Sequence, residues 1–175
     1  YELFLLDLAT GLRRGELLGL KWSDINFESR TLEVKRQIQR VNGMIQETAL
    51  KTHNVYRKIL LPSETVEILK QYKAGQTIES EYVFPSPTGG IMEPDCARKM
   101  LKRVLQRAGL DEMRFHDLRH TFATLALQNG VDVKTLSGIL GHYSAGFTLD
   151  TYAHVTAQMQ EDAAKKVGGF LQQAL

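Results

Sequence analysis

The spacing of apolar residues along the 175-residue chain predicts helices at its beginning, strands after them and further helices to its end. Leucines recur at helical spacing from Leu3 to Leu12, and GELLGLKW adds a second short helix after Gly11. Residues 24–61 alternate moderately between apolar and polar side chains, and Asn42–Gly43 supplies a tight hairpin turn. This segment therefore predicts a small antiparallel sheet.

After residue 62 the pattern becomes helical. We expect helices over 62–73, from Asp95 to Ala108, and over 116–129, 132–140, 148–154 and 156–172. Ser63 and Asp95 are expected to cap the first two. In the second, Leu101, Val104 and Leu105 belong to an apolar stripe opposite its basic residues. The predicted fold class is mainly α with a small antiparallel β-sheet (α+β).

Composition indicates one globular domain, because 43% of the residues are hydrophobic and 24% are charged. Charges interrupt every long apolar run, so we expect no membrane-spanning segment. The chain lacks an initiator Met and opens inside an apolar helical pattern, which indicates a fragment of a larger protein. Cys96 is the single cysteine, which excludes an internal disulfide and favours a reducing, intracellular setting. We expect its thiol to be buried.

The basic residues are clustered, although the net charge is only +2. The segment RKMLKRVLQR contains Arg98, Lys99, Lys102 and Arg103 and no acid, and smaller clusters include Arg57–Lys58. Basic clusters on separate elements suit a groove for a phosphate backbone. Any one cluster alone is better explained as a solvated helix face.

Two segments have the residues of an anion site. In FHDLRHTF, His116 and Arg119 are three positions apart, which places both on one face near the start of a helix. The alternative is that His116 caps the helix and Arg119 pairs with an acid such as Asp117 or Glu16. In TGLRRGELLGL, two arginines follow a glycine turn, and Glu16 is placed to orient one guanidinium while the other faces a ligand.

In their order, the segments TGLRRGELLGLKWSDI, KTHNVYRKILLP, FHDLRHTFAT and LGHYSAGFTLDTYAH resemble the catalytic domain of the tyrosine recombinases, the phage integrase family. His-x-x-Arg followed by Leu-Gly-His and a tyrosine ten residues later (152 − 142 = 10) is the most specific part. The resemblance assigns to the catalytic site Arg13, Lys51, His116, Arg119, His142 and Tyr152.

The resemblance also implies a role for each of these residues. Tyr152 attacks a DNA phosphate, and Arg13 and Arg119 clamp that phosphate. Lys51, at a turn between strands, protonates the leaving 5′-oxygen. His116 either accepts the tyrosine proton or orients the phosphate, and both roles stay open.

Further residues complete the predicted site. Glu16 supports Arg13, and His142 stabilises charge on the phosphate. Tyr143 and His154 are expected to pack rather than react. The expected DNA-binding residues are Arg14, Arg98, Lys99, Lys102 and Arg103. Because no acids appear at metal-ligand spacing, we expect chemistry without a metal, ATP or another cofactor.

The function implied by the resemblance is that of a site-specific recombinase, the integrase of a mobile element. The alternatives are DNA relaxation of the type IB topoisomerase kind and a DNA-binding module without catalysis. Partners would be double-stranded DNA attachment sites and further copies in a tetramer on DNA, with a monomer when free, and the setting would be the bacterial cytoplasm and nucleoid. We expect residues 1–155 to form the catalytic domain, with the N-terminal DNA-binding domain or domains outside this chain. Residues 156–175 are expected to form a tail helix, packed on its own core or exchanged between protomers.

Overall fold

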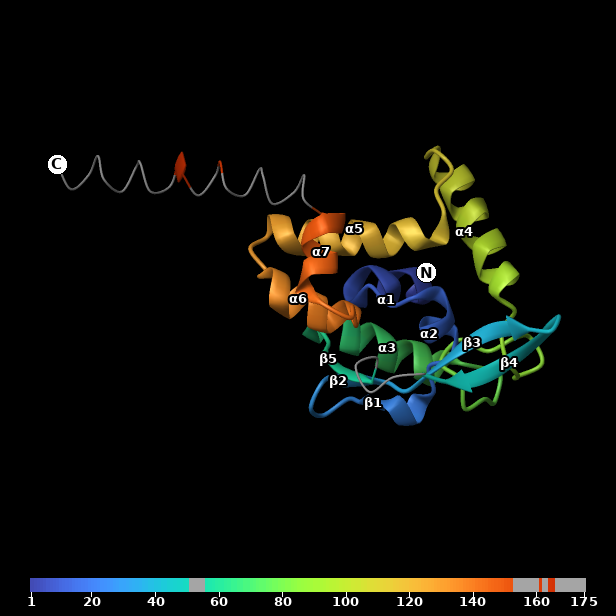
Figure 1. Ribbon diagram of the computed structural model, residues 1–175. Helices are drawn as coiled ribbons and strands as arrows, with labels where there is room; N and C mark the ends of the chain where they lie inside the picture. Colours follow the sequence, from blue (N-terminus) through green and yellow to red (C-terminus); the bar gives the residue numbers. More distant parts are fainter. Residues whose placement is uncertain (51–55, 153–160, 162–163, 166–175) are drawn as a thin grey trace.

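The computed structural model describes residues 1–50, 56–152, 161 and 164–165 (Figure 1). Its helices are α1 (Glu2–Thr10), α2 (Arg14–Leu18), α3 (Ser63–Gly75), α4 (Pro94–Ala108), α5 (Phe115–Gln128), α6 (Val133–Leu140) and α7 (Ala145–Thr151), with a 3-10 helix at Trp22–Asp24. Its strands are β1 (Ile25–Asn26), β2 (Thr31–Val34), β3 (Arg36–Val41), β4 (Met44–Ala49) and β5 (Arg57–Leu60). The predicted class, mainly helical with antiparallel strands, is confirmed.

The strands form two small sheets rather than the expected one. The first has the order β1-β2-β5, with Leu32 of β2 opposite Ile25 and Ile59. The second is the β3-β4 hairpin, which turns at Asn42 and Gly43, both with positive φ. Side chains of β2 alternate between buried and partly exposed, and Leu32 faces the core. Most side chains of β3 and β4, by contrast, are partly or fully exposed. The second sheet therefore extends beyond the core that holds the first (Figure 1).

Helix α1 lies at the centre of the molecule, between α5 on one side and α3 on the other (Figure 1). It has few polar positions, and Leu3, Phe4 and Leu6 are all buried, as expected for a helix that is covered on most sides. A second, smaller core lies where α5, α6 and α7 meet, and it includes Leu136, Leu140 and Tyr152. Tyr152 is therefore packed in this second core and not in the main one.

Several helix ends differ from the expectation. Pro62 precedes α3 without a side-chain cap, and α4 begins at Pro94, so Asp95 lies inside its first turn. Proline suits a first helical position because its missing N–H would have no partner there. Helix α7 begins at Ala145 rather than at 148, because the Ser144 hydroxyl accepts the Phe147 N–H at 3.3 Å and starts the helix earlier.

The surface of α4 corrects two further expectations. Leu101 and Leu105 are buried as expected, but Val104 is 46% exposed, so the apolar stripe is narrower than expected. Cys96 is exposed rather than buried, because Ala97 occupies the neighbouring inward position. The expected domain boundary at residue 155 and nearly all of the tail helix lie outside the described residues. Within the described part of the chain, no helix combines the length and apolarity that crossing a membrane requires.

Candidate active site

The turn between α1 and α2 places Arg13 at the start of α2. Gly11 ends α1 with φ of 60°, and a Cβ atom there would lie 2.3 Å from the Phe122 ring on α5. Glycine is therefore required at this position by both its backbone angle and the closeness of α5. The chain then turns at once into α2, whose N-cap is Arg13.

Glu16 binds two arginines from different elements. Its carboxylate accepts hydrogen bonds from Nη1 of Arg13 at 2.9 Å and from Nη2 of Arg57, on β5, at 2.7 Å. Burial by itself raises the pKa of Glu16, but the hydrogen bonds and charges of Arg57 and Arg13 outweigh it and hold the pKa below its usual value. The buried carboxylate is therefore ionised and balances charge between the two guanidiniums.

The last carbonyl groups of α6 and its C-cap bind three arginines. Arg57 Nε donates to the Ile139 carbonyl at 2.5 Å and Arg119 Nη2 to the Leu140 carbonyl at 2.7 Å. Arg13 Nη2 donates to the carbonyl of Gly141 at 3.2 Å. The final carbonyls of a helix have no partners within the helix and carry partial negative charge. This helix end thus attracts three cations and brings them together.

Arg119 is buried and bridges two helix ends. Its Nη1 donates to the Gly11 carbonyl at 2.6 Å, in addition to the bond to Leu140. Burial, followed by the charge of Arg13, lowers the pKa of Arg119 to about 10, so it stays charged near neutral pH. The alternative of an Arg119 pair with Asp117 is wrong, because Asp117 binds Arg114 instead.

His142 follows Gly141 and lies beside this arginine cluster. A hydrogen bond of 2.7 Å joins its Nδ1 to the hydroxyl of buried Thr148, and its ring packs edge-on against Phe147. Burial, together with the charges of Arg119, Arg13 and Arg57, lowers the pKa of His142 to about 4. The imidazole is therefore neutral near pH 7 and acts as a hydrogen-bonding group.

Tyr152 is 2% exposed, and its hydroxyl lies 2.9 Å from Nδ1 of His120 on α5. Burial raises the pKa of Tyr152, whereas the charge of Arg119 lowers it and offsets part of that shift. In this structure the predicted nucleophile is thus covered and hydrogen-bonded by a histidine.

His116 lies one helical turn before His120, and the two rings meet edge-on with centroids 4.7 Å apart. Burial first, then His120 and Arg119, lowers the pKa of His116. The edge of His116 lines a cavity of about 760 Å³ between α2, α4 and the start of α5. His116 therefore connects Tyr152 and its histidine partner with an open, basic recess.

The recess collects most of the expected DNA-binding residues. Its lining includes Arg14, Arg98, Lys99, Lys102, Arg114 and His116. Arg103 is exposed on α4 but is outside this lining. Lys102 pairs with Glu112 at 3.0 Å, and so part of the positive charge is already balanced.

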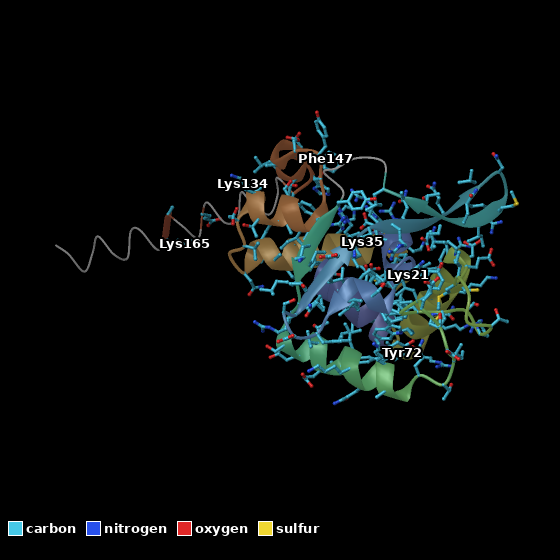
Figure 2. All side chains as sticks on the ribbon, turned by 90° about the horizontal axis from the view of Figure 1, so that it is seen from below. Lys21, Lys35, Tyr72, Lys134, Phe147 and Lys165 are labelled. Atoms are coloured by element: carbon cyan, nitrogen blue, oxygen red, sulfur yellow. The ribbon has the colours of Figure 1, made fainter. Side chains whose placement is uncertain are left out.

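The expectations for the remaining residues have different outcomes. Lys51 and His154 lie outside the described residues. Tyr143 does not pack as expected, because it is 91% exposed beyond the end of α6. Figure 2 shows Phe147 and Lys134 at the α6–α7 end of the molecule, far from Tyr72 on α3. The aromatic residue that packs on His142 is Phe147 rather than Tyr143.

Three residues acquire importance that the sequence did not reveal. His120 contacts Tyr152, Arg57 shares Glu16 with Arg13, and Arg114 lines the basic recess. The i,i+4 spacing of His116 and His120 was a usable signal, since it places both on one helix face. Arg57 stood out only as part of a basic cluster, because its partner Glu16 is 41 positions away. Arg114 pairs locally with Asp117, and only the packing of α5 brings it to the recess.

Comparison with known proteins identifies the class. Residues 1–159 match the model described as the phage integrase family, and the chain belongs to this family. Its fold is that of a tyrosine recombinase catalytic domain. Among described residues, no group of three or more His, Cys, Asp or Glu side chains is placed to hold a metal ion.

Several relatives are similar over almost the whole chain. A tyrosine recombinase XerC-like protein of Caldanaerobacter subterraneus is 37% identical over 93% of this chain and 47% of its own length. Tyrosine recombinase XerA of Pyrococcus furiosus is 32% identical over 93% of this chain and 52% of its own. The chain thus spans about half the length of these relatives.

A solved structure of the Tn1549 transposon integrase in complex with transposon right end DNA superimposes with a TM-score of 0.82. It is 27% identical, and the match covers 96% of this chain and 58% of that one.

Proposed function

We propose that this chain is the catalytic domain of a site-specific DNA recombinase that cleaves and rejoins DNA through Tyr152. The observation that carries the proposal is the convergence of Arg13, Arg57 and Arg119 on the end of α6, beside His142. Arg119 is also close enough to Tyr152 for its charge to lower the pKa of the tyrosine. Such a cluster is suited to a phosphodiester, whose non-bridging oxygens gain charge during attack.

In the proposed reaction, Tyr152 Oη attacks phosphorus and forms a 3′-phosphotyrosyl bond while the bond to the 5′-oxygen breaks. Arg119 and Arg13 each use two of five N–H groups in the contacts described, so donors are left for the phosphate. Neutral His142 adds a further hydrogen bond. Lys51, as the family resemblance implies, protonates the 5′-oxygen. A 5′-hydroxyl then reverses the step, which conserves the bond energy without ATP.

The proposed substrate is double-stranded DNA, bound inside the cell along the recess that contains Arg14, Arg98, Lys99 and Lys102. Support comes from charge and position, since the recess is basic and is bounded on one side by His116. The structure of a similar integrase contains DNA. We further propose attachment sites of a mobile element as targets and a tetramer on DNA as the active assembly.

The test is covalent capture on DNA. The purified protein is incubated with a pool of nicked duplexes whose bases around the nick are randomised, and adducts that survive detergent are isolated and sequenced. The nick lets a short 5′-hydroxyl strand diffuse away, so the protein stays attached to DNA. We expect wild-type protein to form adducts and Tyr152→Phe to form none.

Tyr143→Phe is the matched control, because it removes the same hydroxyl from an exposed tyrosine. It should form adducts at the wild-type rate. If wild-type protein forms no adduct, or Tyr152→Phe still forms one, the proposed function is wrong. A strand-transfer assay on two duplexes built from the recovered sites then distinguishes recombination from relaxation, since a recombinase joins strands of two duplexes and a topoisomerase reseals one.

A further inference from the structure

The hydroxyl of Tyr152 has a defined partner before any DNA is bound. It lies 2.9 Å from Nδ1 of His120, and the two ring centroids are 5.8 Å apart. Tyr152 itself is packed in the core formed by α5, α6 and α7. A phenol held in such a place needs a nearby acceptor before it can attack phosphorus, because the neutral hydroxyl is a poor nucleophile.

The position of His120 on α5 follows from the chain. It immediately follows Arg119 and is four residues after His116, so one helix carries a phosphate-binding arginine and two histidines on adjoining faces. The edge-on contact of the two histidine rings limits how the His120 ring can rotate. The ring is thus fixed between Tyr152 on one side and the recess-lining His116 on the other.

We propose that His120 is a catalytic residue, which orients the Tyr152 hydroxyl and accepts its proton during attack. The inference rests on the proposed function of Tyr152 as the nucleophile. It requires the tautomer with hydrogen on Nε2, so that Nδ1 accepts from the tyrosine O–H. His116 is then left to contact the phosphate rather than the tyrosine.

The proton balance of this step is complete. The Tyr152 O–H bond breaks, its proton moves to His120 Nδ1, and its electron pair forms the bond to phosphorus. The phosphorus bond to the 5′-oxygen breaks, and that oxygen takes a proton from an acid on the opposite side, the role proposed for Lys51. In the reverse step, the His120 imidazolium returns the proton to the departing tyrosine oxygen.

The groups around His120 come from α5 and from the C-cap of α7. Charged or titratable neighbours are His116, Asp117 and Arg119 of α5, and Tyr152. The charge of Arg119 lowers the pKa of Tyr152 and so favours loss of the tyrosine proton.

The test measures single-turnover adduct formation on a nicked duplex recovered by the capture experiment. We expect His120→Ala to be slower by about 100-fold or more, the usual contribution of a general base. His120→Asn places an amide oxygen near Nδ1, so it keeps the orienting hydrogen bond and cannot take the proton. The rate of His120→Asn should fall between those of His120→Ala and wild type, because only the orienting part of the role is kept. Both His120 variants should bind DNA with the affinity of wild type. The control is Gln128→Ala, which changes an exposed residue of α5 and should react at the wild-type rate.

A second substrate separates this role from that of the leaving-group acid. A duplex with sulfur in place of the bridging 5′-oxygen needs no acid, so it should restore a Lys51→Ala variant but not a His120→Ala variant. Wild-type rates in both His120 variants would overturn the inference. Faster cleavage would also overturn it, because His120 would then merely hold Tyr152 back. Both outcomes leave the proposed function standing, since adducts would still form through Tyr152.

Discussion

Replacing Glu16 by Gln tests whether its charge stabilises the arginine cluster. Glutamine keeps the size of the side chain but removes the buried counterion of Arg57 and Arg13. Breaking a buried ion pair costs about 3–5 kcal/mol. Arg57 accounts for most of this, because Arg13 is 38% exposed and its contact is screened by water. For a chain of this size, the melting temperature should fall by roughly 6–20 °C.

The effect should depend on pH in a defined direction. The pKa of Glu16 is lowered from its usual 4.5, so the carboxylate contributes stability above that pH and loses it as pH falls through its folded-state pKa. Glutamine does not titrate. The difference in unfolding free energy between Glu16→Gln and wild type should therefore be largest near neutral pH and become smaller in acid.

Thermal unfolding followed by circular dichroism across this pH range measures both effects. Glu67→Gln is the matched control, since Glu67 pairs with Lys70 at 2.8 Å on the exposed surface of α3. It should leave the melting temperature nearly unchanged. A Glu16→Gln midpoint within about 3 °C of wild type at neutral pH would refute the reasoning, as would a difference that stays constant into acid.

Two further substitutions have defined outcomes. Asp7 is buried, its oxygens have no hydrogen-bond partner among the described residues, and burial raises its pKa from 3.8 to about 8. The wild-type unfolding free energy should therefore fall relative to Asp7→Asn as pH rises from about 4 to 8, by up to about 1.4 kcal/mol per pH unit, and parallel denaturation curves over pH would contradict this. Gly141→Ala puts a Cβ 2.9 Å from Arg57 at φ of 65°, so it should lower both stability and the adduct rate. Gly130→Ala also places alanine at a positive φ, of 85°, but in open space, and should lower stability alone.

The sequence alone was enough to determine the helices and turns that depend only on neighbouring residues. Asn42–Gly43 forms its hairpin because both residues tolerate positive φ, and α4 buries Leu101 and Leu105 because they recur at helical spacing. The order and spacing of the motifs likewise pointed to the family, since residue types and their spacing can be read without a structure. Helix starts were less predictable, because Pro62 and Pro94 each stand beside a residue that could also cap the helix, Ser63 and Asp95.

Tertiary structure alone decided how the site is assembled. The contacts of Arg13 with Gly141, Arg119 with Gly11 and Arg57 with Ile139 join residues 128, 108 and 82 positions apart. Their acceptors are main-chain carbonyls at helix ends, which exist at every helix end and so leave no mark in the sequence. His120 has only one signal in the sequence, its i,i+4 spacing from His116, and this spacing does not identify its partner. Its role follows from the packing of α7 against α5, which brings the Tyr152 hydroxyl within hydrogen-bond distance of its ring.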